Sequence, residues 1–457
     1  MATRGDTAGR PQPSHANHPS ASPTSPPPTL KGGREGVGPS VPWWLRRAVR
    51  LRTFQSLANP HFRTLWLGML ASFMAMNMNI LARGYLAYEL SKSATALGAV
   101  TMMRGLPQLF LSPLGGVVAD RVDKRRLLLV TQVLMGSLAV VNALLIQFGL
   151  IKVWHLALLS LAEGFVFAFN MPSRQAIVPE LVSDEELPNA VALNNSGMNL
   201  TRILGPSLAG ILVGLGDSGL EITFYLIALC YVGFITALWR LPRVRPGRRP
   251  PGKGRFWEQL TGGIRYILGY PALTALIGLA FVPVLFGMPY QSLLPVFARS
   301  VLHVGARELG MLSGAAGLGA LIGSLTVATL ASYPRKDLLQ VGFGVLFGVA
   351  LVGFALTPVF ELALAWVLAV GLCGNAYMAL NSTMIMSVTD RAYHGRVMSV
   401  YLMTWALMPL STLPLGKLVD TLGPQTTEAL AGSVVALFVA AVGLGRVRRP
   451  AEAAERA

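Results

Sequence analysis

Three ionisable side chains, Arg104, Glu163 and Arg202, lie within long apolar runs of this chain. If each run is a membrane-crossing helix, a rise of about 1.5 Å per residue brings all three to a similar depth near the middle of the lipid. Ionisable groups are costly there and need partners or water. We therefore predict that the two cations and the anion form a polar cluster facing a central cavity.

Glu163 is the best candidate for carrying a proton. A carboxylate in a low-dielectric site tends to take up a proton, whereas a nearby arginine opposes this, so a change in access to water would tip the balance. The alternative is a permanent ion pair of Glu163 with Arg104 or Arg202 that only holds helices together. Arg83 and Glu89, near the outer end of the first run, are expected at a gate or an interface.

Uncharged polar and aromatic side chains in other runs are candidates for contact with a bound molecule. We expect these cavity contacts from Asn77, Asn79, Asn375, Tyr377, Asn381 and Trp405. For the two asparagines of the first run, contact between helices is the alternative. The later runs hold no central carboxylate, so proton chemistry is expected in the first half of the chain.

The loop between the second and third runs combines small residues, a carboxylate and several cations. If the two halves pack as in the carrier family that this loop resembles, Asp120 lies near the start of the eleventh run at Arg396, where a helix N-terminus attracts a carboxylate. Breaking that contact would be part of a switch between conformations. The cations Arg121 and Arg125 are expected to pair with Glu180, Asp184 or Glu185. The alternative is that they only follow the rule that cytoplasmic loops are basic. The predicted cytoplasmic gate comprises Gly116, Asp120, Arg121, Lys124, Arg125, Arg174 and Arg396.

Composition restricts the class of protein. Charged residues make up 13% of the 457 residues and hydrophobic ones 53%, which is too apolar for a typical soluble domain. The formal charge of +17 does not predict nucleic-acid binding, because most cations fall between the apolar runs on one side. Cys230 and Cys373 lie within apolar runs, so a disulfide framework is not expected. Because no paired His or Cys spacing, nucleophile–base cluster or nucleotide motif occurs, we expect no metal, no cofactor and no enzymatic activity.

Twelve apolar runs are long enough to cross a hydrocarbon core of roughly 30 Å. They lie near 64–88, 94–118, 127–148, 153–171, 190–214, 220–241, 268–290, 309–331, 338–357, 361–381, 397–419 and 427–446. We expect an all-α membrane protein whose twelve transmembrane helices form two pseudo-symmetric six-helix bundles, at 58–241 and 266–447. Residues 1–57 are expected to form a disordered tail and a basic interfacial helix, 242–265 a cytoplasmic linker, and 448–457 a cytoplasmic tail.

The distribution of cations predicts the orientation. With the N-terminus in the cytoplasm, the inner segments carry about 30 of the 38 Lys and Arg residues, so both termini are expected there. We expect a monomeric, multi-pass protein of the cell (inner) membrane. The basic helix near residues 44–54 is expected to contact anionic membrane lipids.

These motifs resemble those of the major facilitator superfamily, over residues 58–447. The family's loop signature is matched by Gly116, Asp120, Arg121, Lys124 and Arg125, whereas Asp123 stands where the family usually has glycine. The stretches 170–175, 178–182, 187–190 and 199–210 resemble the branch of enterobactin exporters and macrolide-efflux-like carriers. Gly205, Pro206 and Gly210 partly resemble the fifth-span motif of drug/proton antiporters and are expected to bend their helix.

The resemblance implies a secondary transporter that exports amphiphilic small molecules, drug- or siderophore-like, in exchange for protons by alternating access. Its partners would be the small-molecule substrate, protons and membrane lipids. Two other functions stay open. One is an importer or uniporter of a small metabolite, and the other is a membrane sensor or scaffold that transports nothing.

Overall fold

The computed structural model describes residues 52–242, 256–330 and 332–455, and the regular secondary structure of these residues is helical. The first half contains η1 (Arg52–Ala58), α2 (Pro60–Ser91), α3 (Ala94–Arg121), α4 (Lys124–Gln147), α5 (Val153–Ile177), η2 (Val178–Glu180), α6 (Leu187–Val213) and α7 (Gly219–Arg240). The second half contains α8 (Phe256–Gly269), α9 (Pro271–Val282), η3 (Pro283–Gly287), α10 (Tyr290–Ser300), α11 (Ala306–Thr329), α12 (Lys336–Leu356), α13 (Phe360–Val388), α14 (His394–Leu422) and α15 (Pro424–Glu455). Most of the predicted interfacial helix near 44–54, and much of the predicted linker, lie outside the described residues.

Polar residues between the apolar runs determine where several helices begin. Asn59 accepts hydrogen bonds from two backbone N–H groups in the first turn of α2. Asp123 does the same in the first turn of α4. Such side chains satisfy backbone donors that the start of a helix leaves free. Asp123, which replaces the usual glycine of the family signature, therefore acts as the N-cap of α4.

Ten helical runs are long and apolar enough to cross a membrane, judged by length and composition of the described residues. α3 and α6 have comparable lengths of 28 and 27 residues but are not among the ten. Their lower hydropathy follows from polar residues such as Arg104 in α3 and Arg202 in α6. By this criterion, ten of the twelve expected spans have a counterpart.

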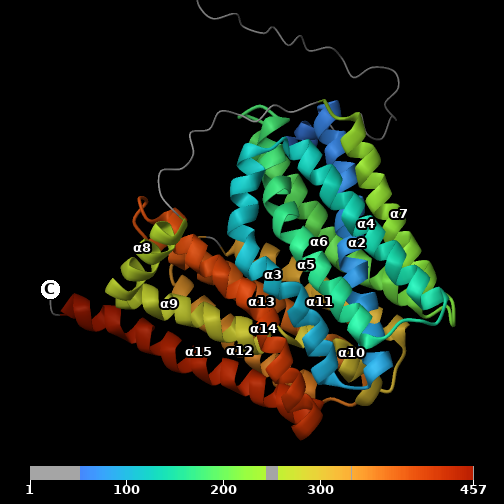
Figure 1. Ribbon diagram of the computed structural model, residues 1–457. Helices are drawn as coiled ribbons and strands as arrows, with labels where there is room; N and C mark the ends of the chain where they lie inside the picture. The colour runs from blue at the N-terminus through green and yellow to red at the C-terminus, as the bar shows by residue number, and fades with distance from the viewer. Residues whose placement is uncertain (1–51, 243–255, 331, 456–457) are drawn as a thin grey trace, which may run out of the picture. The chain divides into compact units, whose positions relative to one another are not determined.

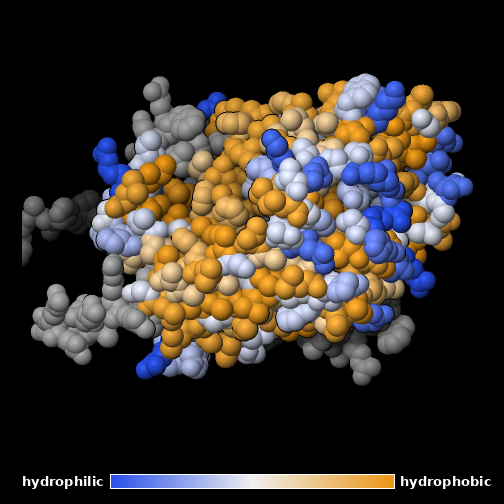
Figure 2. Space-filling view, turned by 90° about the horizontal axis from the view of Figure 1, so that it is seen from below, coloured by the Kyte–Doolittle hydropathy of each residue, from blue (hydrophilic) through white to orange (hydrophobic). Residues whose placement is uncertain are grey.

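Large apolar side chains cover much of the surface. Phe110, Leu229 and Trp239 are 70%, 63% and 71% exposed. Figure 2 shows broad hydrophobic areas across the visible face. Exposed apolar surface on this scale is unusual for a soluble monomer, whereas side chains that face lipid are expected to be apolar. These features are those of a multi-pass membrane protein.

The proline-rich stretch in the second half differs from the prediction. The sequence predicts a seventh span over 268–290, but α9, η3 and α10 together form one membrane-length run from Pro271 to Ser300. Proline lacks an N–H and clashes with a regular α-helix. The backbone accommodates Pro283 through the π-helical turn η3, in which Met288 N donates to Pro283 O at 2.9 Å. The predicted boundary near 290 is therefore wrong, because the prolines distort the helix without ending it.

Each half of the chain packs extensively within itself. In the first half, α2 contacts α6 and α7, while α3 and α4 contact α5. In the second half, α13 contacts α11 and α12, and α15 contacts α9 and α12, beside which it lies in Figure 1. The halves meet where α3 contacts α14, α6 contacts α11 and α2 contacts α10.

Contacts between the halves involve the N-terminal part of α3 and the C-terminal parts of α6 and α14. Thr412 Oγ1 in α14 donates to Gly98 O in α3 at 3.0 Å. Gly210 in α6 and Gly310 in α11 are so close that a Cβ atom on Gly310 would lie 2.9 Å from the Gly210 Cα. Small residues permit such close helix packing. We call this contact region, which includes these two pairs, the seam.

Candidate functional site

Glu163 in α5 is almost fully enclosed, with 2% of its surface exposed, and forms an ion pair with Arg83 of α2. Asn79 Nδ2 donates to both carboxylate oxygens of Glu163, each at 3.1 Å. Arg104 Nε in α3 lies 4.0 Å from Glu163 Oε2, and Arg83 also donates to Ser160 Oγ at 3.0 Å. These five residues link three helices, and we call them the carboxylate cluster.

Helical spacing explains how the cluster assembles. Asn79 and Arg83 are four residues apart in α2, and Ser160 and Glu163 are three apart in α5, so each pair shares one face of its helix. The sequence predicts Arg104 or Arg202 as the ionic partner of Glu163. In the structure Arg83 is the closer partner, Arg104 is more distant, and Arg202 forms no ion pair with Glu163. Arg83 was expected at a gate or interface, and its spacing from Asn79 was the signal that it belongs here.

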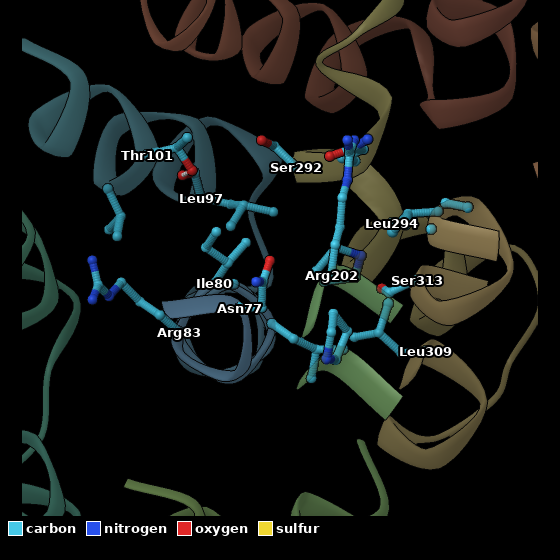
Figure 3. Close-up of a pocket in the computed structure, with 18 of the residues that line it drawn as sticks. Asn77, Ile80, Arg83, Leu97, Thr101, Arg202, Ser292, Leu294, Leu309 and Ser313 are labelled. Atoms are coloured by element: carbon cyan, nitrogen blue, oxygen red, sulfur yellow. Dashed lines mark hydrogen bonds between the residues drawn. The ribbon is translucent and has the colours of Figure 1, made fainter. Parts of the chain in front are cut away.

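A cavity of about 140 Å³ lies between α2, α3, α6, α10 and α11. Its charged lining residues are Arg83, Arg104 and Arg202, and none of the residues described around it is an Asp or Glu. Neutral polar groups are contributed by Asn77, Thr101, Gln291, Ser292 and Ser313. Figure 3 shows Arg202 extending between α2 and helices of the second half, while Arg83 extends away from it. Arg104 and Arg202 thus share the cavity, whereas Glu163 lies behind Arg83 and Arg104.

Other predicted cavity residues lie elsewhere. Asn375 Nδ2 donates to a backbone oxygen of α11 at 2.9 Å. Tyr377 Oη and Asn381 Nδ2 donate to backbone oxygens of α9 at 2.5 and 3.3 Å. These three side chains therefore hold helices of the second half together, and Trp405 is 36% exposed. The four were expected along the cavity, but the structure places them outside its lining because their helix faces point elsewhere.

The predicted gate residues occupy several different environments. Lys124 Nζ pairs with Glu180 Oε1 at 2.5 Å, and Arg125 donates to two backbone oxygens at the end of α7 at 2.8 and 2.9 Å. Glu180 was expected to pair with Arg121 or Arg125, but Lys124 takes this role because it begins α4 and is buried beside the loop. Arg121 is exposed, and the side chain of Asp120 lies outside the described residues.

Arg174 lies inside the first half of the chain instead of at its surface. Its Nε donates to Asn170 Oδ1 at 2.5 Å, and a second nitrogen donates to Ser72 Oγ. The guanidinium lies 4.9 and 5.0 Å from the ring centroids of Phe73 and Phe234. Hydrogen bonds and cation–π contacts together hold this cation between helices.

The start of α14 packs on α8. A Cβ atom on Gly263 would lie 2.8 Å from the backbone oxygen of Arg396, and the Arg396 guanidinium lies 5.2 Å from the Tyr393 ring centroid. Gly116, by contrast, has open space beside it. The predicted contact between Asp120 and the start of α14 falls outside the described side chains, so this gate stays a prediction.

The seam has polar contacts of its own. Asp420, near the end of α14, accepts a hydrogen bond from Ser93 Oγ at 2.6 Å and two more from backbone N–H groups of α3 at 2.8 and 2.9 Å. Arg299 in α10 pairs with Glu89 in α2 and donates to Tyr85 Oη at 2.6 Å. A carboxylate is favoured at a helix N-terminus. The interaction expected of Asp120 with α14 thus has a counterpart in Asp420 with α3.

Comparison with known proteins identifies relatives across nearly the whole described chain. A family model described as a transmembrane secretion effector matches residues 51–457. The chain is 26% identical to the staphyloferrin A transporter of Staphylococcus aureus, covering 74% of this chain and 85% of that protein. It is 26% identical to the enterobactin exporter EntS of Citrobacter koseri, covering 88% and 93%. It is 22% identical to macrolide efflux protein A of Streptococcus pyogenes, covering 79% and 88%. The predicted resemblance to this branch of carriers is confirmed.

Solved structures share the fold. A bacterial homologue of the human lysosomal transporter Spinster, in an inward-facing and occupied conformation, superposes with a TM-score of 0.67 at 14% identity, covering 87% of this chain and 97% of that one. The nucleoside transporter NupG superposes with a TM-score of 0.63 at 14% identity, covering 84% and 98%. At these identities the likeness shows the fold alone.

Proposed function

Since the chain belongs to the transmembrane secretion effector family of the major facilitator superfamily, we propose that it exports amphiphilic small molecules by proton antiport. Drug- or siderophore-like cargo is inferred because its relatives include an enterobactin exporter and a macrolide efflux protein. The mechanism we propose is alternating access, in which one half of the chain rocks against the other around a central site.

The cavity between the halves is the observation that carries this proposal. Its lining comes from α2, α3 and α6 of the first half and from α10 and α11 of the second. Movement of one half against the other would therefore change access to it. Lys124 and Arg125 lie in a loop that we assign to the cytoplasm, because basic loops favour that side. The seam is then extracellular, and cargo for export enters from the cytoplasm.

We further propose that α3 and α6 cross the membrane together with the ten more apolar runs. That gives twelve spans in two bundles of six, with both termini in the cytoplasm of a bacterium and the helices in its inner membrane. The polar residues of α3 and α6 are tolerated because these helices contact the other half and the cavity. A monomer is sufficient, since one chain lines the whole cavity.

We assign Glu163 a holding role within this mechanism. Its ion pair with Arg83, its two hydrogen bonds from Asn79 and its proximity to Arg104 compensate the carboxylate from several sides. Compensation of this kind favours a fixed, ionised carboxylate over one that gains and loses a proton. The alternative role, proton carriage by Glu163, predicts that a stable Arg83→Gln/Glu163→Gln variant loses gradient-driven transport.

Transport into proteoliposomes tests the proposed function. Purified chain is reconstituted with a pH gradient of either sign, and N-dansylglycine is followed by fluorescence as an amphiphilic probe. We expect accumulation only where protons leave the vesicle as the probe enters, and none after an ionophore collapses the gradient. Accumulation that ignores the gradient would indicate a uniporter, and accumulation in the same direction as protons would indicate an importer.

A scaffold or sensor is the competing function from another class. Deletion of residues 1–40 distinguishes it, because the transport machinery proposed above lies entirely within residues 52–455. We expect the truncated chain to keep gradient-driven transport. Complete loss of transport from a truncated protein that still reaches the membrane would favour the scaffold.

A further inference from the structure

The cavity has an unbalanced charge. Arg83, Arg104 and Arg202 line it, and Glu163 behind them offsets one of the three. Three guanidinium groups minus one carboxylate leave a net charge of +2 for these four side chains. Uncompensated charge away from bulk water is costly, so the arrangement favours a bound group of opposite sign.

The three cations are satisfied to different degrees. Arg83 binds Glu163 and Ser160 through its two terminal nitrogens, although its Nε has no hydrogen-bond partner. Arg104 approaches Glu163 only to 4.0 Å, and its buried Nε has no hydrogen-bond partner. Arg202 makes no hydrogen bond or ion pair with the described residues, although it lines the cavity between the halves. Two guanidinium groups are therefore available to a ligand.

We propose that the cavity binds anionic amphiphiles, whose carboxylate accepts hydrogen bonds from Arg202 and Arg104. The planar guanidinium group matches the two oxygens of a carboxylate. Apolar lining residues, including Ile80, Leu97 and Leu309, would hold the apolar body of the same molecule. This inference rests on the proposed transport function and narrows its cargo to anions.

Binding of two matched probes tests the charge requirement without transport. N-Dansylglycine carries a carboxylate, and N-dansylglycinamide has the same shape without the charge. Each is titrated into the purified full-length chain in detergent, and dansyl fluorescence reports binding. We expect the carboxylate to bind at least about 10-fold more tightly, which corresponds to about 1.4 kcal/mol.

Single substitutions connect this preference to the cavity. Arg202→Gln and Arg104→Gln should each reduce the preference to about 2-fold or less while amide binding stays unchanged. Arg202→Lys keeps the charge without the planar group and should keep an intermediate preference. Arg391→Gln is the matched control, since Arg391 is exposed and outside the cavity lining. Equal binding of the probes, binding of neither, or a preference that survives both glutamine variants would overturn the proposal.

An anionic lipid headgroup offers similar oxygen atoms, so the same cations could bind lipid in place of cargo, and the two sources are compared directly. The titrations are repeated in nanodiscs of phosphatidylcholine and of phosphatidylglycerol, in about 0.5 M salt to screen surface charge. We expect the same preference in both, and its loss in phosphatidylglycerol alone would assign the cations to lipid. Gradient-driven transport without a carboxylate preference contradicts this inference alone. A carboxylate preference without gradient-driven transport contradicts the proposed function alone.

A second observation, independent of the first, concerns Glu428 in α15. Glu428 is 1% exposed, its Oε1 has no hydrogen-bond partner, and it makes no ion pair with the described residues. Glu163 has three compensating neighbours, whereas Glu428 has none of that kind in the part of the chain that the structure describes. Burial without a compensating charge favours a neutral carboxylic acid.

Helix α10 both lines the cavity and contacts α15, which carries Glu428. Tyr290, at the start of α10, is 2% exposed. Gln291, a lining residue of the cavity, donates from Nε2 to Tyr290 Oη at 3.5 Å. The helices packed against α15 include α9, α10, α12 and α14. Their other charged side chains, none of which pairs with Glu428, are Arg299, Lys336, Asp337, Arg396, Lys417 and Asp420.

We infer that Glu428 is the proton-binding group of the exchange, which again presupposes the proposed function. A proton from extracellular water forms an O–H bond on the Glu428 carboxylate and is released to cytoplasmic water after the halves move. A cargo anion beside Arg202 would influence that proton across α10. The proton and the cargo would thus occupy neighbouring sites in the two halves of the chain.

Glu428→Gln tests this assignment because it copies the neutral acid. We expect its thermal stability to equal or exceed that of the wild type, and cargo-for-cargo exchange to persist. Gradient-driven accumulation should fall by more than about 10-fold. Glu361→Gln, at an exposed site at the start of α13, should keep accumulation. Full gradient-driven accumulation or lowered stability in Glu428→Gln would overturn the assignment, whereas a wild type without gradient dependence would contradict the proposed function itself.

Discussion

Removing one partner of the carboxylate cluster should destabilise the protein more than removing both. Glu163→Gln leaves Arg83 and Arg104 beside a neutral amide. Arg104 alone, at 4.0 Å, represents about 4 kcal/mol of attraction at an effective dielectric constant of about 20. Breaking a buried ion pair typically costs about 3–5 kcal/mol. We expect Glu163→Gln near the upper end of that range, and Arg83→Gln near the lower end because Arg104 and Asn79 still compensate Glu163.

The double variant Arg83→Gln/Glu163→Gln loses one charge of each sign. It leaves Arg104, whose side chain is 21% exposed and can reach water. We therefore expect the double variant to be more stable than either single variant. Since the single losses of about 3 and about 5 kcal/mol add to about 8 kcal/mol, this order requires a coupling free energy of more than about 5 kcal/mol.

Thermal unfolding with a thiol-reactive fluorogenic dye measures this order. Cys373 is 8% exposed and Cys230 is half-buried, so both become reactive as the helices separate. The apparent Tm should fall from wild type to double variant, to Arg83→Gln, and then to Glu163→Gln. A double variant whose Tm loss equals the sum of the two single losses would refute the pairing. If the double variant is stable but shows no gradient-driven transport, Glu163 would be assigned the proton-carrying role.

Three further outcomes are expected. Gly310→Ala should reduce transport by about 10-fold or more, because the added Cβ would press on the Gly210 backbone. Gly342→Ala is the control and should be tolerated, since Gly342 has open space beside it. Equal transport activities of the two variants in uptake assays would contradict this expectation. Asp420→Asn should weaken the cap on α3 by about 1 kcal/mol. In a Thr101→Cys background, which places a thiol in the cavity, it should therefore speed labelling by a maleimide added from the extracellular side. An unchanged labelling rate would argue against an extracellular seam. Arg174→Lys should lower stability by about 1–3 kcal/mol, since an ammonium lacks the planar group that bonds to Asn170 and Ser72 while it lies over both rings. Arg391→Lys at an exposed site should melt like the wild type.

Most helix positions could be predicted from the sequence because apolar runs and their polar boundaries are local properties. The helical run that begins at Pro271 could not be predicted, since the effect of its prolines depends on whether a π-helical turn accommodates them. Counting residues also predicts a similar depth for Arg104, Glu163 and Arg202. It does not predict which of these side chains meet, because contact depends on how each helix is rotated about its axis. Glu163 therefore faces Arg83, and only the spacing of Asn79 and Arg83 in α2 hinted at this.

The polar residues of the second half illustrate the same limit. Asn375, Tyr377 and Asn381 are correctly recognised as unusual in an apolar helix, but their direction depends on the packing of α9 and α11 against α13. The burial of Glu428 was not predicted, for a different reason. It lies in the first turns of α15, where a carboxylate normally reaches solvent, and only the packing of the neighbouring helices encloses it.

The charged groups at the seam differ from the polar groups within each half. The side chains of Arg299 and Glu89 are 38% and 23% exposed, and Asp420 is exposed, so hydration can replace the bonds of these three residues as they break, whereas the seam bond from Thr412 to Gly98 O is buried. Within the second half, Gln340 donates a fully buried hydrogen bond to Asn381, and separating the two would deprive both side-chain amides of this bond. Thermal fluctuation should therefore open the exposed contacts of the seam reversibly long before it loosens the packing within either half of the chain.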